Sequence, residues 1–245
     1  MVNDAITVVT VTKNNDTGLL RTLASIAKAN CRPHEVVVID GGCSAETAAI
    51  TLRYKDKINI RVVSEADHGI YDAMNKGLRK VRTPLVHYLN AGDEIFGELY
   101  SDCRVPSLFR VKIIDPQNNN FWMDRIKLAG YGYCHQGIVF PSNHLPFNSN
   151  LQIAADFESV CLTFPSGLGK LPVSEEGGFV VYKLGGVSTV RYRIGNREII
   201  SAAWHLLSRW RFLRIASFIV LKSFVPRNMK RYLAQSFAII GGPLR

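Results

Sequence analysis

The chain has 245 residues, of which 47% are hydrophobic and 20% charged. This balance excludes a disordered chain and is enough for one domain with a buried core and a small appendage. The formal net charge of +10 is concentrated at the end, because residues 183–245 hold 12 lysines and arginines but a single acidic residue, Glu198. A basic tail suits RNA, an anionic membrane or an acidic ligand. Since no RNA-binding motif accompanies the charge, we expect no nucleic-acid partner.

The five cysteines form no CxxC pair, and their number is odd. The apolar run at residues 6–11 is short for a secretory leader and follows Asp4. We therefore predict free thiols and a cytoplasmic location. Near the C-terminus, the longest stretch without a charge has thirteen residues, 232–244, which is too short to span a bilayer.

The first 90 residues alternate between strand and helix patterns. Apolar and β-branched runs predict strands at residues 6–12, 35–40, 58–64 and 85–89. Helices are predicted behind the possible caps Asp16 and Thr17, from the cap Ser44 to Tyr54, and over residues 70–81, where apolar side chains recur every three or four positions. This alternation predicts an α/β fold with a mostly parallel sheet, right-handed crossovers and flanking helices.

Polar side chains gather where the predicted strands end. Residues 64–77 and 89–93 are rich in carboxylates and amides and lie after the third strand and at the end of the fourth, where an open α/β sheet has its ligand crevice. The second strand ends in Asp40-Gly41-Gly42, which suits either a turn or a contact to a ribose or base. Because the loop after the first strand has neither a GxGxxG nor a P-loop pattern, a Rossmann dinucleotide site is disfavoured.

Four motifs, in this order, resemble those of glycosyltransferase family 2: TVTKNN (residues 10–15), VIDGGCS (38–44), SEADHGIYDAMNKG (64–77) and LNAGD (89–93). Within the family, the chain is most similar to bacterial exopolysaccharide transferases of the colanic acid type, with CHQGIVFP (134–141) and GGVST (185–189) as further matches. The resemblance implies a Rossmann-like GT-A catalytic domain over residues 1–190. Residues 191–245 then form a basic, mainly helical C-terminal extension.

The resemblance also implies a bound nucleoside-diphosphate sugar, with Thr12 and Asp40 on its nucleoside. The implied donor-binding residues are Thr12, Asp40, Glu65, Asp67, Asp72, Asn75 and Asn90. Asp93 is implied to hold Mg²⁺ or Mn²⁺, a Lewis acid that stabilises the diphosphate leaving group. The usual Asp-x-Asp of the family is replaced here by Asn90-Ala91-Gly92-Asp93, and a turn that ends the strand is the alternative interpretation.

The same resemblance places the catalytic base at Asp156. Its apolar neighbours favour the raised pKa that suits a proton acceptor, and the alternative role is the N-cap of a helix that runs to Leu162. His135 and Gln136 precede an apolar strand pattern. The resemblance implies that they contact the acceptor or hold other site residues by hydrogen bonds.

Aromatic and basic residues are interleaved between residues 204 and 227. This pattern suits helices that lie on an anionic membrane surface, which we assign to residues 197–233, or a helical pair packed against the catalytic part or a second subunit. Arg209, Arg211 and Arg214 do not share one side of a helix, which counts against a simple amphipathic anchor.

The sequence therefore predicts an inverting glycosyltransferase of bacterial surface polysaccharide biosynthesis, with a glycan or lipid-linked saccharide as acceptor. It would be cytoplasmic and peripheral on the inner face of the membrane. The alternative is a non-catalytic nucleotide-binding scaffold of a membrane-associated assembly complex. A nucleotidyltransferase is disfavoured because no glycine-rich basic loop follows the first strand.

Overall fold

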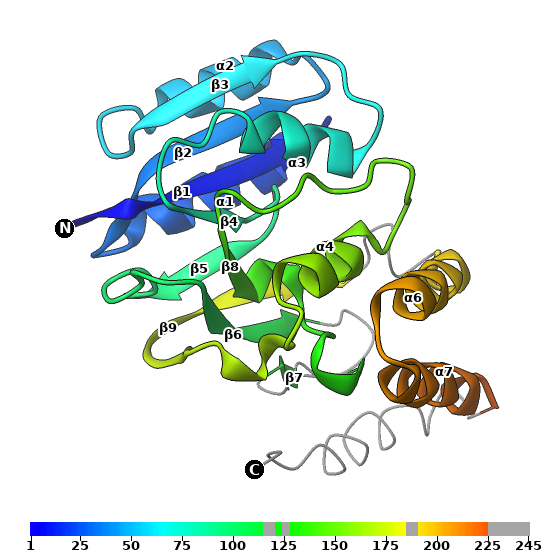
Figure 1. Cartoon of the computed structure of the whole chain (residues 1–245). Coiled ribbons are helices and arrows are strands. Elements are labelled where there is room, and N and C mark those ends of the chain that lie inside the picture. Colours follow the sequence, from blue (N-terminus) through cyan, green and yellow to red (C-terminus); the bar gives the residue numbers. More distant parts are fainter. Residues whose placement is uncertain (115–120, 124–127, 185–190, 225–245) are drawn as a thin grey trace.

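The computed structural model describes residues 1–114, 121–123, 128–184 and 191–224 (Figure 1). The strands are β1 (Val2–Thr12), β2 (Arg32–Asp40), β3 (Ile60–Ser64), β4 (Leu85–Tyr88), β5 (Glu94–Gly97), β6 (Ser107–Ile114), β7 (Phe121–Met123), β8 (Ile138–Pro141) and β9 (Val173–Lys183). The α-helices are α1 (Asp16–Lys28), α2 (Ala45–Leu52), α3 (Ile70–Leu78), α4 (Ala155–Thr163), α6 (Tyr192–Leu206) and α7 (Arg209–Phe224). Short 3₁₀ helices are η1 (Leu128–Gly130), η2 (His135–Gly137) and η3 (Leu168–Lys170).

One mixed sheet forms the centre of the molecule, in the order β3-β2-β1-β4-β8-β6-β9-β5, with β7 paired to β6. Strands β3, β2, β1 and β4 are parallel, as predicted. Beyond β4 the pairs β4–β8, β8–β6 and β9–β5 are antiparallel and β6–β9 is parallel, so the sheet is parallel throughout its first half and mixed in its second. Parallel neighbours need a long crossover, usually a helix, and the described residues between β4 and β8 contain no α-helix.

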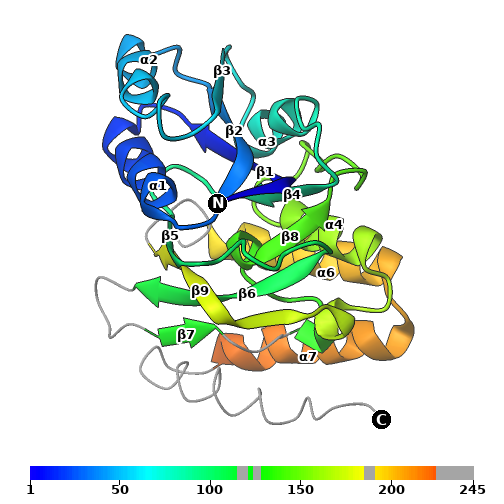
Figure 2. The same ribbon diagram turned by 90° about the vertical axis from the view of Figure 1, so that its left-hand side faces the viewer.

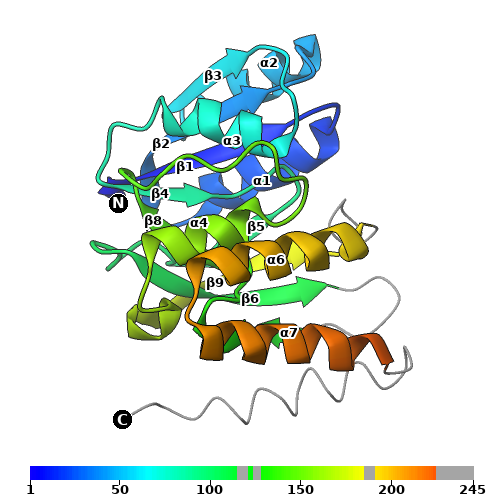
Figure 3. The same ribbon diagram turned by 45° about the vertical axis from the view of Figure 1, so that its right-hand side comes forward.

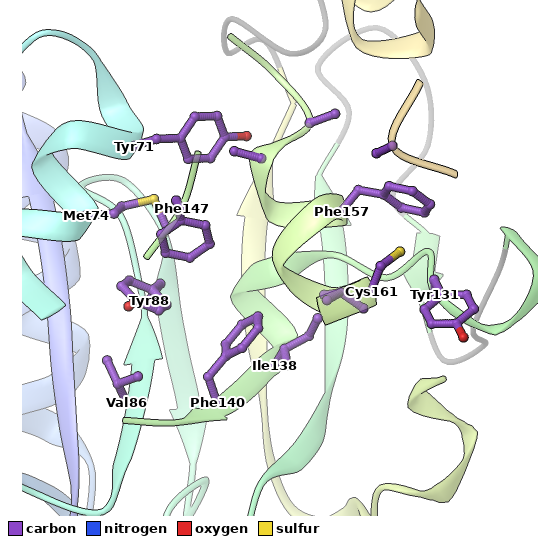
Figure 4. Packing of buried hydrophobic residues seen from close by; sticks show 14 of the residues in the cluster. Tyr71, Met74, Val86, Tyr88, Tyr131, Ile138, Phe140, Phe147, Phe157 and Cys161 are labelled. Carbon is purple, nitrogen blue, oxygen red and sulfur yellow. The ribbon is translucent and has the colours of Figure 1, made fainter. Parts of the chain in front are cut away.

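Helices cover both faces of the sheet. Figure 2 shows the parallel half between α1 and α2 on one side and α3 on the other, and Figure 3 shows α3, α4, α6 and α7 along the same face. Successive side chains of a strand point to opposite faces. Accordingly, Val8 belongs to the buried cluster that contains Leu23 of α1, whereas Val9 belongs to the cluster that contains Met74 of α3. Figure 4 shows Met74 beside Tyr71, Phe147 and Tyr88 of this second cluster.

The helix starts differ in detail from the sequence prediction. Asn15, not Asp16 or Thr17, caps α1, and its side chain accepts a hydrogen bond from the Gly18 N–H at 3.1 Å. Ser44 caps α2 as predicted, but α2 ends at Leu52 and α3 at Leu78, each a few residues early. Early ends are expected because terminal turns lack hydrogen-bond partners.

The C-terminal helices belong to the same core as the sheet. Ala202 and Ala203 of α6 and Ile215 and Ile219 of α7 are buried in the cluster that contains Val9. The helical character predicted for this region is confirmed over residues 192–224, and the packed arrangement agrees with the alternative to a free membrane anchor. The boundary predicted at residue 190 lies outside the described residues and stays a prediction.

Candidate functional site

The ligand crevice predicted from the sequence would lie at the carboxyl ends of the parallel strands, where the chain leaves β1, β2, β3 and β4. Two predicted donor-site residues offer buried polar atoms there that have no partner: the Thr12 hydroxyl at the end of β1 and the Asn90 side-chain oxygen after β4. A buried polar atom without a hydrogen bond is costly. Thr12 and Asn90 therefore mark a place where a ligand can supply the missing partner.

Asp40 ends β2, is fully buried and organises the following turn. Its carboxylate accepts hydrogen bonds from the backbone N–H groups of Gly42 at 3.0 Å and Ser44 at 2.8 Å, and from the Ser64 hydroxyl at 3.1 Å. The turn role that the sequence left open is therefore present in the structure. The contact with a nucleoside stays a prediction.

Asp67 lies against the same turn. Its carboxylate accepts from the Gly69 N–H at 3.1 Å and from the Lys13 ammonium at 3.3 Å, and its side chain is 5% exposed. A Cβ on Gly41 would lie 1.5 Å from Asp67 Oδ2. Glycine at position 41 is thus required for Asp67 to approach the end of β2.

Lys76 joins the two remaining predicted donor-site carboxylates. Its ammonium lies 3.4 Å from Glu65 and 3.5 Å from Asp72, and it donates to the carbonyl oxygen of Ala66. The His68 backbone N–H, which donates to Asp72 at 3.0 Å, and then Lys76 hold the pKa of Asp72 below its usual value. Both carboxylates border the crevice, with Glu65 half exposed.

Asn75 has a role that the sequence did not predict. Its side-chain amide donates to the Phe147 carbonyl oxygen and accepts from the Phe147 N–H, both at 2.8 Å. These two bonds pair α3 with the segment before α4, so the amide of Asn75 is already used within the protein. The predicted contact of Asn75 with the donor stays a prediction.

Asp93 is 6% exposed and accepts a hydrogen bond from the Gln136 side chain at 3.2 Å. Burial raises the pKa of Asp93 to about 7, against the opposing effects of His135 and Gln136. The backbone carbonyl of Gln136 accepts from the ring of His87 at 2.7 Å. Burial lowers the pKa of His87 to about 4, so His87 is neutral and holds the Gln136 turn in place.

His135 brings Asn90 and Asp156 together. Its Nδ1 lies 3.1 Å from Asp156 Oδ2, and its Nε2 lies 3.4 Å from Asn90 Nδ2. Because an amide nitrogen donates, Nε2 accepts and the proton sits on Nδ1, which donates to Asp156. His135 thus connects Asn90, a predicted donor-site residue, to Asp156, the predicted base.

Asp156 lies in the first turn of α4, whose N-cap is Ala154, so the alternative role of Asp156 as the N-cap is wrong. Its Oδ1 accepts from the Phe157 N–H at 2.8 Å and lies 3.5 Å from the Tyr71 hydroxyl. Tyr71 also stacks on Phe147 (Figure 4). The Asp156 side chain keeps 26% of its surface exposed, which leaves it accessible to a substrate.

The sequence model of "Glycosyl transferase family 2" matches residues 7–102. A PGL/p-HBAD biosynthesis glycosyltransferase of Mycobacterium bovis is 28% identical over 156 residues, which cover 56% of this chain and 60% of that protein. Residues 7–102 therefore carry the sequence pattern of glycosyltransferase family 2, and the chain is similar to glycosyltransferases beyond them. The matched part spans less than two thirds of the mycobacterial relative's own length.

Two solved structures of low sequence identity share the fold of this chain. Residues 1–349 of S. aureus TarS in complex with UDP-GlcNAc give a TM-score of 0.66 at 14% identity and cover 95% of this chain and 80% of that one. A mannosyltransferase from Pyrobaculum calidifontis in complex with GDP-Man and Mn²⁺ gives 0.59 at 16%, covering 96% and 80%. The predicted GT-A fold is confirmed.

The family 2 match ends before the predicted base and the residues that contact it. His135, Gln136 and Asp156 all lie beyond residue 102, and the motif at residues 185–189 lies outside the described residues. Lys76 and Tyr71, which contact predicted site residues, were not predicted. Their signal is in the sequence, since both lie within the motif at residues 64–77.

Proposed function

We propose that this chain is an inverting glycosyltransferase that moves a sugar from a nucleoside diphosphate to a hydroxyl group of a glycan or lipid-linked saccharide. The observation that carries the proposal is the placement of Asp156. Its carboxylate is hydrogen-bonded to His135, which also contacts Asn90 at the donor side of the crevice. A partly exposed carboxylate beside a nucleotide site is what an acceptor hydroxyl needs as a base.

In the proposed reaction Asp156 takes the proton of the acceptor hydroxyl while that oxygen attacks the anomeric carbon. The bond from this carbon to the diphosphate oxygen breaks on the opposite side, so the configuration inverts and the nucleoside diphosphate leaves. His135 orients Asp156 by donating from Nδ1 to Oδ2. The Tyr71 hydroxyl lies 3.5 Å from Oδ1 and restricts the position of the Asp156 carboxylate from the other side.

The donor would lie along the ends of β1, β2 and β4. The hydroxyl of Thr12 and the side-chain oxygen of Asn90, both without a partner, would bind its polar groups. Thr12 and Asp40 would face the nucleoside, and the turn that the Asp40 carboxylate holds would support this contact. Asp67 would lie near the nucleotide and the transferred sugar. Glu65, before α3, and Asp72, in its first turn, would likewise lie near the nucleotide and the transferred sugar.

The residues present fit a divalent cation. Among the residues that the structure describes, no three His, Cys, Asp or Glu side chains gather as a metal cluster. Mg²⁺ and Mn²⁺, however, need few protein ligands when phosphate oxygens complete the shell. Asp93, whose carboxylate is buried and accepts a hydrogen bond from Gln136, would supply an oxygen ligand, and the bound cation would neutralise charge on the leaving diphosphate.

An anionic membrane surface is the partner that we propose for the C-terminal helices, because a lipid-linked acceptor would be presented there. The outward side of α7 is apolar, with Trp210 73% and Phe224 81% exposed. Arg209 and Arg214 are exposed beside it, and Arg211 instead packs on the Tyr131 ring. Apolar and basic side chains on one surface suit the headgroup region.

This surface contact agrees with a cytoplasmic protein of surface polysaccharide biosynthesis, attached at the inner face of the membrane. Over the described part of the chain, no helix has the length and hydropathy needed to cross a membrane. The proposed attachment is therefore peripheral and runs through residues 197–224, the described part of the predicted segment.

The proposal is tested by isothermal titration of UDP, GDP, CDP and dTDP, each with Mn²⁺ and with a chelator. We expect one nucleotide to bind in a metal-dependent manner, and Asp93→Ala to remove the metal dependence. The matched control is Asp56→Ala, which removes an exposed carboxylate in the turn after α2. If no nucleotide binds to the wild type, the donor site is refuted.

A further inference from the structure

Glu198 is the single acidic residue among residues 183–245, and it contacts the segment that leads to the base. Its carboxylate accepts hydrogen bonds from three successive backbone N–H groups, those of Gln152, Ile153 and Ala154, each at 2.9 Å. These residues immediately precede α4. Asp156 follows Ala154 by two positions.

The start of α4 lacks a cap of its own. Its N-cap residue is Ala154, which makes no side-chain hydrogen bond to the helix. The N–H groups at a helix start need acceptors, and the helix dipole favours a negative charge there. Glu198 supplies both from a helix more than forty residues later in the sequence.

The peptide groups on the two sides of Ile153 are held by different elements. Its N–H donates to Glu198 of α6, and its carbonyl oxygen accepts from the Tyr71 hydroxyl of α3. Tyr71 also lies 3.5 Å from Asp156. The segment before the base is thus fixed between α3, which borders the donor site, and α6 of the C-terminal region.

Helix α6 is shaped to approach this segment. A Cβ on Gly195 would lie 2.8 Å from Ile153 Cγ2, so glycine allows the close contact. Arg191 at the N-cap donates to the Gln152 side chain at 2.9 Å. Residues 191, 195 and 198 recur at helical spacing and share one side of the helix, and all three contact the segment before α4.

We propose that Glu198 is a positioning residue for the base Asp156, so that the C-terminal helix α6 is part of the catalytic unit. This inference rests on the proposed function. Glu198 fixes the first turn of α4, and that turn keeps Asp156 at 3.1 Å from His135. Without the Glu198 carboxylate, Asp156 would move away from its position relative to the acceptor hydroxyl, while the donor site would stay intact.

The test compares Glu198→Gln with Gly195→Ala and with the control Glu46→Gln, which removes an exposed carboxylate paired to Arg53 on α2. Glu198→Gln keeps the shape but replaces one acceptor oxygen with a donor. We expect faster hydrogen exchange at residues 152–154 and a shifted His135 ring signal in histidine-labelled NMR spectra, assigned with His135→Gln. Nucleoside diphosphate release from UDP-, GDP-, CDP- and dTDP-sugars should lose about 100-fold in kcat with an unchanged donor KM.

Gly195→Ala should change hydrogen exchange at residues 152–154, the His135 ring signal and kcat in the same direction as Glu198→Gln. This second variant tests the inference if Glu198→Gln folds poorly. An unmoved His135 signal in both variants overturns the inference, as does an unchanged kcat with the exchange increased. If the wild type turns over no nucleotide sugar, the proposed function fails by itself. The exchange and the ring signal then still decide whether Glu198 places Asp156.

Discussion

Replacing Asp93 by asparagine should change how stability depends on pH. Burial raises the pKa of Asp93 from 3.8 to about 7 in the folded chain, and this difference corresponds to ~4 kcal/mol. Because the folded-state pKa is the higher one, the stabilisation is complete below pH 3.8 and is lost as the pH rises through 7. Asparagine resembles the protonated acid and does not titrate.

The assay is urea unfolding of the wild type and Asp93→Asn in the presence of a chelator, from pH 5 to pH 8. The free energy of unfolding of the wild type, relative to the variant, should fall by about 2.5 kcal/mol over this range. The control Asp56→Asn, at an exposed position, should run parallel to the wild type. Parallel curves for Asp93→Asn would show that burial does not hold this carboxyl group protonated.

The same titration has a consequence for the proposed cation. A metal ion competes with the proton on Asp93, so the apparent affinity of the nucleotide complex for Mn²⁺ should fall about tenfold between pH 8 and pH 6. Calorimetry in buffers of different ionisation enthalpy measures the released proton. Mn²⁺ affinity that is independent of pH would remove Asp93 from the proposed metal site.

Three further outcomes are expected. Asp156→Asn should abolish nucleoside diphosphate release and leave nucleotide binding within a few-fold, as measured by titration calorimetry; retained turnover would place the base elsewhere. Gly41→Ala should weaken nucleotide binding by about tenfold or more, because the new Cβ displaces Asp67. Gly169→Ala, which meets no atom within 4 Å, is its control. Trp210→Ser should reduce sedimentation with phosphatidylglycerol vesicles, and equal binding by the variant would refute the α7 contact.

Local patterns predicted the elements that depend on neighbours in the sequence. The β-branched run ending at Thr12 became the buried end of β1, and the apolar spacing after residue 70 became α3. The strand ends then placed Asp40 and Asn90 at one edge of the sheet, because parallel strands end together. These features follow from periodicity and from the rules of parallel sheets.

Contacts between distant segments were not predictable in the same way. Asn75 pairs with Phe147, 72 residues away, and Glu198 reaches Gln152 across 46 residues. A polar residue on a helix has the same local pattern whether it faces water, a ligand or a peptide group. Its role is decided by the chain that packs against it, and this explains why the contact of Asn75 with Phe147 was not predicted.

The junction of the two halves of the sheet has a mechanical consequence. Asn90 follows β4, His135 precedes β8, and these strands are antiparallel neighbours with Val86 opposite Phe140. Neighbouring strands lie ~4.8 Å apart, a spacing set by backbone hydrogen bonds. The β4–β8 pairing thus fixes the separation between Asn90, a predicted donor-site residue, and His135, which contacts the predicted base. The surrounding loops can differ in length and sequence without changing this separation.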